Sequence, residues 1–296
     1  MKRVLVAGAT GYLGRYVVKA LKRQGYYIKV LVRQPDKLNQ PGDFLEPAIG
    51  DDVDEVVIGD ITKPDTIKHI CNGIDYVFSS VGLTRKSNGL TFNDVEYQGN
   101  VNLLREAAYN HVSKFIYIHV YCDDAWGHPG PLIEAKESFV KTLKKSSVSH
   151  IIIRPTGYFS DLTQFFAMAK KGRVYLLGDG KTKMNHIHGE DLAQFCIETL
   201  SEVNQIFDVG GPEILTYEQI AQLAFHELNK KRHMTYIPTG LLKLISLGMK
   251  WVNKHNYGML QFLINVMTHN LIAPKYGKHK IKDLFHRLHE LRCKQS

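Results

Sequence analysis

The sequence predicts an α/β fold in which a doubly wound parallel sheet is accompanied by a smaller, mostly helical C-terminal lobe. Three observations predict it: short apolar runs alternate with helical patterns, a glycine-rich turn joins the first run to the first helix, and the alternation loosens after Pro155. Near-continuous apolar strands separated by helices are typical of parallel sheets covered on both faces. We therefore expect a sheet domain over residues 1–154 and a lobe over 155–296, with a strand near 206–209 returning to the sheet.

The expected elements follow one another in a β-α-β-α order through the first domain. Right-handed crossovers then give a doubly wound sheet, which binds ligands at the carboxyl ends of its strands. Strands are expected at residues 3–7, 28–32, 55–58, 76–79, 115–118, 150–153 and 206–209. Helices are expected at 12–24, 65–72, 93–110 and 134–146, and in the lobe at 161–171, 190–201, 217–229 and from 240 onward.

The composition is that of an ordinary globular protein, with 44% hydrophobic and 23% charged residues in a chain of 296. The four cysteines are far apart and form no Cys-x-x-Cys pair, which argues against a disulfide framework and a structural zinc site. His186 and His188 have no third ligand at a suitable spacing, so no metal site is expected. No apolar run reaches the ~18 residues that a membrane span needs. We expect a cytoplasmic protein.

A glycine turn closes the first strand and opens the first helix. Gly8, Gly11 and Gly14 follow the apolar run 4–7 with the spacing Gly-x-x-Gly-x-x-Gly. Gly8 permits a tight turn, Gly11 lets the backbone approach a pyrophosphate, and Gly14 allows close contact between helix and strand. The spacing departs from the commonest dinucleotide fingerprint, so its place between strand and helix carries the prediction of a dinucleotide site. The alternative is a glycine turn that binds no ligand.

The end of the second strand indicates which dinucleotide is bound. NAD sites usually carry Asp or Glu here, which accepts a hydrogen bond from the ribose 2′-hydroxyl. This sequence has Arg33 at that point and Lys37 shortly after it. A guanidinium pairs with a 2′-phosphate through its planar fork, so NADP(H) is favoured over NAD(H). A solvated basic turn is the alternative interpretation.

Further candidate contacts follow the third and fourth strands. Asp60 can accept a hydrogen bond from the adenine amino group, and residues 79–82 place a close-packed backbone beside the ribose and nicotinamide. Ordinary strand-end turns are the alternative for both. The expected cofactor-binding residues up to this point are Gly8, Thr10, Gly11, Tyr12, Leu13, Gly14, Arg33, Lys37, Asp60, Ile61, Ser79, Ser80, Val81 and Gly82.

Seven segments, spread over nearly the whole chain, share the order and pattern of a known family. They are GATGYLGRYVVKAL, VEYQGNVNLLREAA, KFIYI, AKESFVKTLKKSSVSHIIIRPTGYFSDL, IHGEDLAQFC, FDVGGPEILTYEQIAQLA and APKYGKHKIKDLF. These segments resemble the atypical short-chain dehydrogenase/reductase superfamily, and within it the NmrA-like and divinyl-reductase-like NAD(P)H-binding proteins. The resemblance implies a Rossmann-type domain in which Arg33 reads the 2′-phosphate and Asp60 contacts the adenine. It also implies that Lys136 is the active-site lysine, which contacts the hydroxyls of the nicotinamide ribose.

The sequence departs from the superfamily's catalytic pattern at two positions. The Tyr-x-x-x-Lys pair would need tyrosine at position 132, where Leu132 stands, and His119 replaces the usual serine after the fifth strand. The candidate catalytic residues are therefore Lys136, Tyr121 and His119, the last because an ordinary imidazole titrates near neutral pH. A structural role is the alternative for each of them. The candidate substrate contacts are Tyr158 and Phe159.

The last segment of the C-terminal lobe, residues 241–296, carries nearly all of the net charge of +9. Residues 241–296 hold ten lysines and arginines against two acidic residues, a net charge of +8. Within 241–254, Lys243, Lys250 and Lys254 share one face of an expected helix. Lysines that simply face water are one interpretation, and contact with an anionic membrane surface or an acidic partner is the other. No nucleic-acid-binding motif is present, so nucleic acid is not an expected partner.

Two functions are consistent with the sequence. The first is an NAD(P)H-dependent oxidoreductase that transfers hydride to or from a small organic substrate, with apolar substrates among the candidates. The missing tyrosine argues against routine carbonyl reduction and leaves an activated C=C bond or a lysine-assisted reduction. The second is a non-catalytic NADP(H)-binding redox sensor or assembly subunit.

Overall fold

The computed structural model describes residues 1–83, 89–122, 126, 130–242 and 254–293, and these form two compact units. The first unit comprises Met1–Val120, Pro131–Arg154 and Leu192–Phe207. The second unit comprises Tyr121–Gly130, Pro155–Asp191 and Asp208–Ser296. Each unit is therefore built from three separate stretches of chain.

The first unit is built on a seven-stranded sheet with the order β3-β2-β1-β4-β5-β6-β9. The pairings from β3 through β6 are all parallel. The order reverses between β1 and β4, where doubly wound sheets open a crevice at the carboxyl ends of their strands. The strands are β1 (Arg3–Ala7), β2 (Tyr27–Val32), β3 (Glu55–Ile58), β4 (Tyr76–Ser79), β5 (Lys114–Ile118), β6 (Ser149–Pro155) and β9 (Gln205–Val209).

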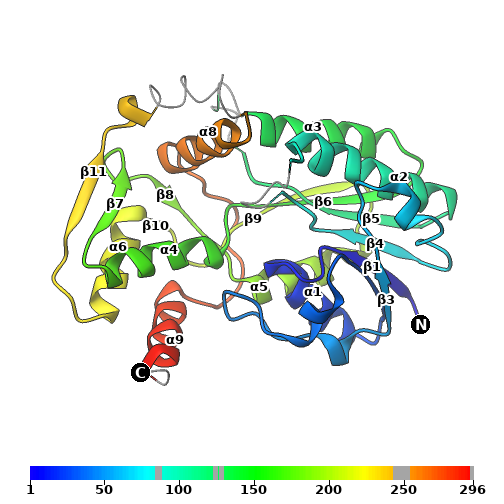
Figure 1. Cartoon of the computed structure of the whole chain (residues 1–296), viewed down its shortest axis with the longest axis horizontal. Helices are drawn as coiled ribbons and strands as arrows, with labels where there is room; N and C mark the ends of the chain where they lie inside the picture. The colour runs from blue at the N-terminus through cyan, green and yellow to red at the C-terminus, as the bar shows by residue number, and fades with distance from the viewer. Residues whose placement is uncertain (84–88, 123–125, 127–129, 243–253, 294–296) are drawn as a thin grey trace. The chain divides into compact units, whose positions relative to one another are not determined.

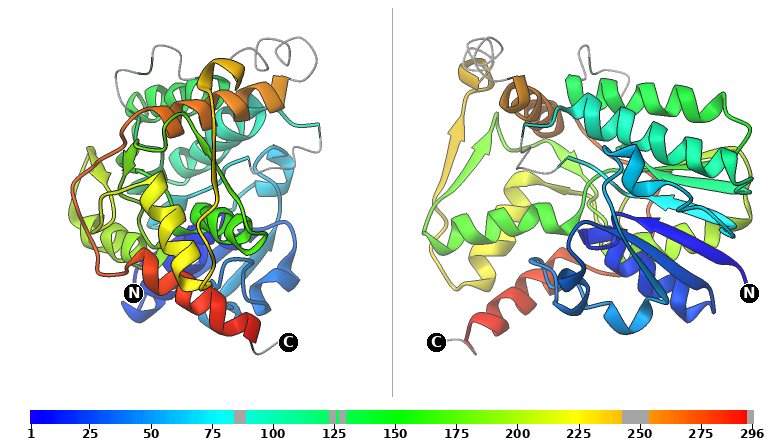
Figure 2. Two further views of the ribbon diagram at one scale, coloured as in Figure 1. Left: turned by 90° about the vertical axis from the view of Figure 1, so that its left-hand side faces the viewer. Right: turned by 45° about the vertical axis from the view of Figure 1, so that its right-hand side comes forward.

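Helices cover both faces of this sheet (Figure 1). One face carries α2 (Asn100–Tyr109) and α3 (Pro131–Lys144), which lie side by side in both figures (Figure 2). The opposite face carries α1 (Tyr12–Arg23) and α5 (Gly189–Glu198). Buried rings of β5 pack on α3: the centroids of Phe115 and Tyr117 lie 5.7 and 4.7 Å from that of Phe139. The expected α/β fold with a parallel sheet is confirmed.

The second unit is mostly helical. Its helix α6 (Tyr217–Glu227) packs against α4 (Phe159–Lys170) and α9 (Ile281–Cys293). The unit also contains the helix α8 (Lys254–Thr268). Two small sheets complete the unit: β7 (Val174–Leu177) with β11 (Met234–Ile237), and β8 (Lys183–Met184) with β10 (Leu215–Thr216). Among the helices that the structure describes, none has the length and apolar character of a membrane span.

The structure departs from the expected elements in three places. Residues 65–72 form only a short 3₁₀ turn, Pro64–Ile67, followed by irregular turns. The helix expected over 93–110 begins as a π-helical turn, η4 (Asn93–Gly99), before it continues as α2. The four short strands of the second unit were not expected, because they lie after Pro155, where the alternation of strands and helices loosens. The basic helix face expected within 241–254 lies largely outside the described residues.

Candidate functional site

A glycine turn lies where the strand order reverses. Gly8 follows β1 with a φ of +89°, a value that side chains rarely adopt, and the Gly11 amide donates to the Gly8 carbonyl over 3.0 Å. A Cβ added to Gly14 would lie 2.1 Å from that same carbonyl oxygen. Glycine at position 14 therefore lets α1 start directly against the end of β1, which is the role that the sequence predicts for it.

The N-terminus of α1 is suited to an anion. Gly11 is its N-cap and has no side chain to bond the first amides, and the first turn contains no acidic residue. Gly11 is exposed and Thr10 and Tyr12 are half-buried, whereas Leu13 is buried in the core. Amides at the positive end of a helix dipole bind phosphate oxygens without a cationic side chain. The turn therefore fits the pyrophosphate of a dinucleotide.

The segment after β4 closes the other side of the turn. The Ser80 amide donates to the Ala7 carbonyl over 3.1 Å, and Ser80 Oγ lies 2.8 Å from where a Cβ on Gly8 would stand. Ser79 is fully buried and its hydroxyl donates to Asn100 over 2.6 Å, so it supports the segment from the inside. The residues of this segment that remain accessible to a ligand are Ser80, Val81 and Gly82.

Arg33 and Lys37 follow β2 at the same edge of the sheet. The side chain of Arg33 is exposed directly after the strand, and that of Lys37 is exposed within the 3₁₀ helix Pro35–Asn39. In a doubly wound domain, the end of the second strand faces the ribose of the adenosine half. An exposed guanidinium there fits a 2′-phosphate.

Arg15 of α1 is a residue of this region that the sequence analysis missed. Its guanidinium is 3% exposed and donates to the carbonyls of Thr10, Lys37, Gln40 and Pro47 over 2.7 to 3.2 Å. Burial lowers the pKa of the Arg15 guanidinium, although a guanidinium remains protonated in proteins. Arg15 thus ties the glycine turn to the segment that carries Lys37. From the sequence alone, Arg15 is indistinguishable from an ordinary arginine of an amphipathic helix. Its four carbonyl acceptors come together only in the folded chain.

We expect Arg15→Ala to lower the free energy of unfolding by about 2–3 kcal/mol. The reason is that four main-chain carbonyls lose the hydrogen bonds that the charged guanidinium donates to them. Urea denaturation followed by circular dichroism measures this change. Arg15→Lys keeps the charge but not the fork of donors, and should recover only part of the loss. An unchanged denaturation midpoint in Arg15→Ala would contradict this reading of the contacts.

Asp60 and Ile61 follow β3. Asp60 Oδ1 accepts from the amide and the hydroxyl of Thr62 over 2.9 and 2.8 Å, so the carboxylate stabilises its own turn. The side chain of Ile61 is buried, and its carbonyl accepts from Asn102 over 2.9 Å. Asp60 is half-buried, and its contact with adenine stays a prediction. Ile61 belongs to the core beneath it.

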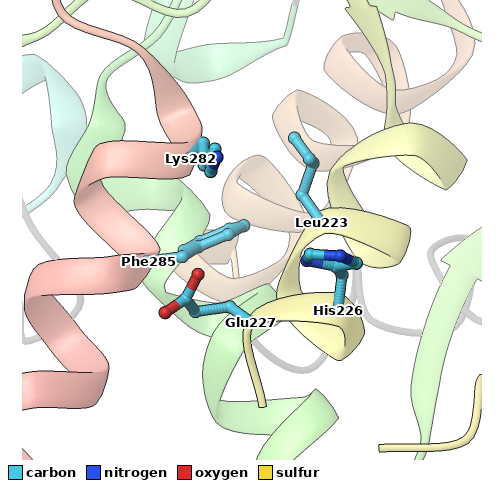
Figure 3. A pocket seen from close by; sticks show the side chains of 5 residues that line it. All are labelled: Leu223, His226, Glu227, Lys282 and Phe285. Atoms are coloured by element: carbon cyan, nitrogen blue, oxygen red, sulfur yellow. The ribbon is translucent and has the colours of Figure 1, made fainter. Parts of the chain in front are cut away.

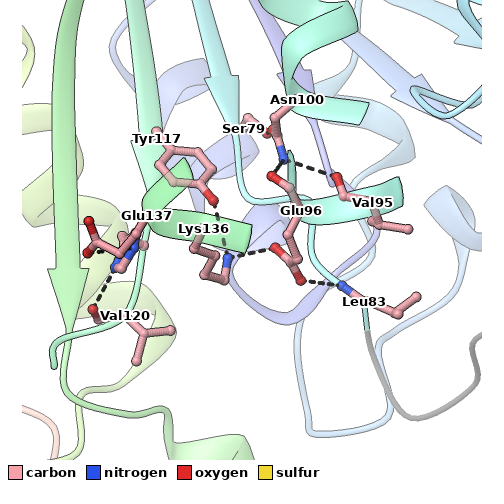
Figure 4. A network of polar contacts seen from close by, with 10 residues as sticks. Ser79, Leu83, Val95, Glu96, Asn100, Tyr117, Val120, Lys136 and Glu137 are labelled. Carbon is pink, nitrogen blue, oxygen red and sulfur yellow. Dashed lines mark hydrogen bonds and ion pairs between the residues drawn. The ribbon is translucent and has the colours of Figure 1, made fainter. Parts of the chain in front are cut away.

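Lys136 is buried and paired with a carboxylate that the sequence analysis missed (Figure 4). Its Nζ lies 2.8 Å from Glu96 Oε2 and 3.5 Å from the hydroxyl of Tyr117. Glu96 is 1% exposed and lies in the π-helical turn η4, and its other oxygen accepts from the Leu83 amide over 2.7 Å. Burial raises the pKa of Tyr117, with Lys136 opposing it, so this phenol stays protonated near neutral pH. Leu132 is buried in α3 at the position where the resemblance would require a tyrosine.

His119, at the end of β5, is 1% exposed. Its Nδ1 donates to the Val120 carbonyl over 2.7 Å, and its Nε2 lies 3.3 Å from Glu137 Oε1. Burial, with the charge of Lys136 as a smaller cause, lowers the pKa of His119 to about 3. The ring is therefore neutral at physiological pH, and its contact with Glu137 is not an ion pair. The role expected for His119 assumed an ordinary imidazole, and its burial argues against it as the proton donor.

Tyr121, Tyr158 and Phe159 belong to the second unit. Tyr121 and Tyr158 are half-buried, and Tyr158 is the N-cap of α4, where its amide donates to Asp161 over 3.1 Å. Phe159 is buried, with its ring edge-on to His188 at a centroid distance of 5.4 Å. Its side chain is thus part of the core of that unit, which argues against a substrate contact. The roles of Tyr121 and Tyr158 stay predictions.

Three side chains of the second unit bring potential metal ligands within 4.8 Å of one another: His188, Glu190 and His279. The rings of His188 and His279 stack with centroids 4.1 Å apart, so their nitrogens do not converge on one point. His188 Nδ1 already accepts from the Glu190 amide over 3.2 Å. Asp191 accepts from the His279 ring over 2.8 Å and from the amides of Lys278 and His279 over 3.0 Å. These contacts fit a structural tie for the segment before α9 better than a metal site.

A small hollow lies between α6 and α9 of the second unit (Figure 3). Its volume is about 240 Å³, whereas ligand pockets usually enclose about 300–1,000 Å³. Glu227 in its wall already accepts from His286 over 2.9 Å. We therefore do not assign the substrate to this hollow, which is lined by Leu223, His226, Glu227, Lys282 and Phe285.

The sheet and the glycine turn together define a class of protein. A parallel sheet whose order reverses between β1 and β4, with a glycine turn and a helix N-terminus at the reversal, is the framework of a Rossmann-type dinucleotide-binding domain. Residues 8–203 match the sequence model of the NAD(P)H-binding family. The chain belongs to this family.

Relatives of the chain include reductases and assembly factors. It is 26% identical over 298 residues to divinyl chlorophyllide a 8-vinyl-reductase, chloroplastic, of Cucumis sativus, a match that covers 93% of this chain and 66% of the reductase. It is 27% identical over 247 residues to Photosystem II assembly factor Ycf39 of Trieres chinensis, covering 82% of this chain and 74% of the factor. The chain therefore spans about two-thirds of the length of that reductase.

A solved structure shares the fold. NADPH-dependent quinone oxidoreductase QOR2 from Escherichia coli, complexed with NADPH, superposes with a TM-score of 0.72 at 17% identity over 97% of this chain and 99% of that one. The family match confirms the NAD(P)H-binding class expected from the sequence.

Proposed function

We propose that the chain is an NADPH-dependent reductase that transfers hydride to a small organic substrate. One observation carries the proposal: the buried Lys136 is linked to the glycine turn through the segment after β4. Ser80 of that segment contacts Gly8, and Leu83, three residues further on, donates to the carboxylate that pairs with Lys136. An ammonium held beside a dinucleotide site can contact the ribose and deliver a proton.

Each residue of the site has a separate task in this proposal. The glycine turn and the N-terminus of α1 hold the pyrophosphate, and Arg33 pairs with the 2′-phosphate. Lys136 orients the ribose of the nicotinamide half and carries the proton. Bound NADPH supplies the hydride.

The residues around Lys136 favour an activated C=C bond as the group that is reduced. Carbonyl reduction requires an acid at the carbonyl oxygen, and Leu132 stands where that acid would be expected. The imidazole of His119 is neutral and buried, so it does not replace the acid. A conjugated C=C bond needs a proton only after the hydride has added, and an ammonium can provide it. The relative from Cucumis sativus is named for the reduction of a vinyl group, which supports this substrate class.

The preference for NADPH is tested by calorimetric titration with NADPH and NADH. We expect the protein to prefer NADPH, and Arg33→Ala to weaken NADPH binding about ten- to a hundredfold, the loss typical of hydrogen bonds to a charged group. NADH binding should not change, because NADH has no 2′-phosphate. Arg105→Ala, which removes an exposed arginine from α2, is the matched control. Equal affinity for both nucleotides would reject the preference.

The reaction is tested by following NADPH absorbance with soluble enones as acceptors. Consumption of NADPH with formation of the saturated product supports the proposal. Tight NADPH binding without turnover of any acceptor would reject the proposed reaction while leaving the nucleotide site intact.

The relatives named as assembly factors favour a second candidate, a redox-dependent docking protein. In this candidate the second unit binds an acidic protein partner through basic side chains that are exposed near α9. Capture of such a partner that changes with the ratio of NADP⁺ to NADPH, in a protein without turnover, would select this candidate over the reductase. The exposed basic residues are Lys275, Lys278, Lys280, Lys282 and Arg287.

A further inference from the structure

Glu96 is a charged side chain in the interior of the first unit. Its carboxylate is 1% exposed, and each of its oxygens contacts a different element: Lys136 Nζ of α3 at 2.8 Å, and the Leu83 amide after β4 at 2.7 Å (Figure 4). Transfer of a carboxylate from water into a protein interior costs several kcal/mol unless it is paired. A leucine or glutamine would fill the same volume without that penalty. The charge itself therefore requires an explanation.

The backbone around Glu96 is arranged to hold the carboxylate in place. Glu96 lies in the π-helical turn η4, and such turns are frequent at functional sites. The Asn100 side chain donates to the Glu96 carbonyl over 3.0 Å and accepts from Ser79 over 2.6 Å, which fixes the turn to the end of β4. A Cβ on Gly82 would lie only 3.2 Å from Glu96 Oε1, so the backbone after β4 passes directly over the carboxylate.

We propose that Glu96 is the positioning residue for Lys136: it keeps the amine protonated and aimed, and it fixes the amine relative to the strand end that lies against the nucleotide. This inference rests on the proposed reductase function. Glu96 does not contact the substrate itself, because its carboxylate is enclosed. The negative charge of Glu96, 2.8 Å from Lys136 Nζ, favours the protonated amine. The proton therefore stays on Lys136 until it is transferred to the substrate.

The proton balance of the step is simple. Hydride from bound NADPH adds to one carbon of the C=C bond, and the electron pair of that bond moves to the neighbouring carbon. This carbon takes a proton from Lys136 Nζ, so a C–H bond forms and an N–H bond breaks. The products are NADP⁺, the saturated substrate and a neutral amine, which recovers its proton from water. The charge of Glu96 stabilises the ammonium each time it re-forms.

A purely structural role for Glu96 makes a different prediction. If Glu96 served only to hold Leu83, glutamine would replace it well, because the side-chain carbonyl of glutamine also accepts from an amide. Glu96→Gln therefore keeps the shape and the bond to Leu83 while it removes the charge on which the positioning role depends.

The experiment compares the wild type with Glu96→Gln and with Glu134→Gln, a matched change at an exposed glutamate of α3. We expect Glu96→Gln to lower kcat by about tenfold or more, within the range of lost acid catalysis. The alkaline limb of the pH profile of kcat should also move to lower pH. If Glu96→Gln had the same kcat and the same pH profile as the wild type, the proposal would be overturned.

A second measurement does not depend on turnover. The affinity for NADPH is measured for the wild type, Lys136→Met, Glu96→Gln and the double variant, in which both charges are absent. If Glu96 positions Lys136, the lysine substitution weakens binding in the wild type but has little further effect in the Glu96→Gln background. Additive effects would overturn the positioning role. Failure of the wild type to reduce any acceptor would instead reject the proposed function and leave this result standing.

Discussion

Gly14→Ala is expected to weaken dinucleotide binding severely. A Cβ at position 14 would lie 2.1 Å from the Gly8 carbonyl oxygen and 2.8 Å from Ala9 Cα, both of which are backbone atoms that cannot turn aside. The start of α1 must therefore move away from β1, and the amides that would bind the pyrophosphate move with it. Calorimetric titration with NADPH measures the loss, and we expect an affinity weaker by about a hundredfold or more, as if the pyrophosphate contacts were missing.

Gly240→Ala is the control for this change. Gly240 has no heavy atom within 4 Å of its added Cβ and no positive φ, so the same chemical change meets open space. Its NADPH affinity should equal that of the wild type. Near-normal binding by Gly14→Ala, with an unchanged circular dichroism spectrum, would show that the contact between α1 and β1 does not shape the nucleotide site.

Lys136→Met should cost both stability and activity. Methionine fills the volume of the lysine stem but leaves the carboxylate of Glu96, which is 1% exposed, without its cation. Removal of one partner of a buried ion pair typically destabilises a protein by about 3–5 kcal/mol. Urea denaturation should show this loss, and turnover of the C=C acceptor should fall to background.

Two further variants make this prediction specific. Lys141→Met removes an exposed lysine from the same helix and should leave stability and turnover unchanged. Adding Glu96→Gln to Lys136→Met removes the stranded charge and should restore much of the stability, but none of the turnover. A single variant Lys136→Met that denatures at the wild-type midpoint would mean that the pair contributes little to folding.

The strands and the glycine turn could be predicted because their signals are local. Each strand of the main sheet has four to seven residues and contains a short apolar run, and Gly8, Gly11 and Gly14 allow the tight turn and the close helix–strand contact that follow the first strand. These features depend on steric rules that act within a few residues. Local periodicity also marked the main helices, but it does not distinguish a π-helical turn such as η4 from an α-helical one.

The electrostatics of the site could not be predicted in the same way. Arg15 and Glu96 look like solvent-facing charges of amphipathic helices, and only tertiary packing encloses them among carbonyls and an ammonium. His119 shows the same effect in reverse. Its residue type suggested a proton donor near neutral pH, whereas its burial at the end of β5 keeps the ring neutral. Chemical roles that depend on desolvation are set by neighbours distant in sequence.

The hydrogen bonds of Arg15 to main-chain carbonyls affect how the protein could be redesigned. Three of its four acceptors are main-chain carbonyls between residues 37 and 47, so these three contacts do not depend on which side chains that segment carries. Exposed side chains of this stretch, such as Lys37 and Asp43, can therefore be exchanged while these contacts hold the backbone, whereas the buried Leu38 and Glu46 must be kept. Conversion between the two nicotinamide coenzymes should then be within reach of a library confined to Arg33 and these exposed positions, provided that Arg15 is left untouched.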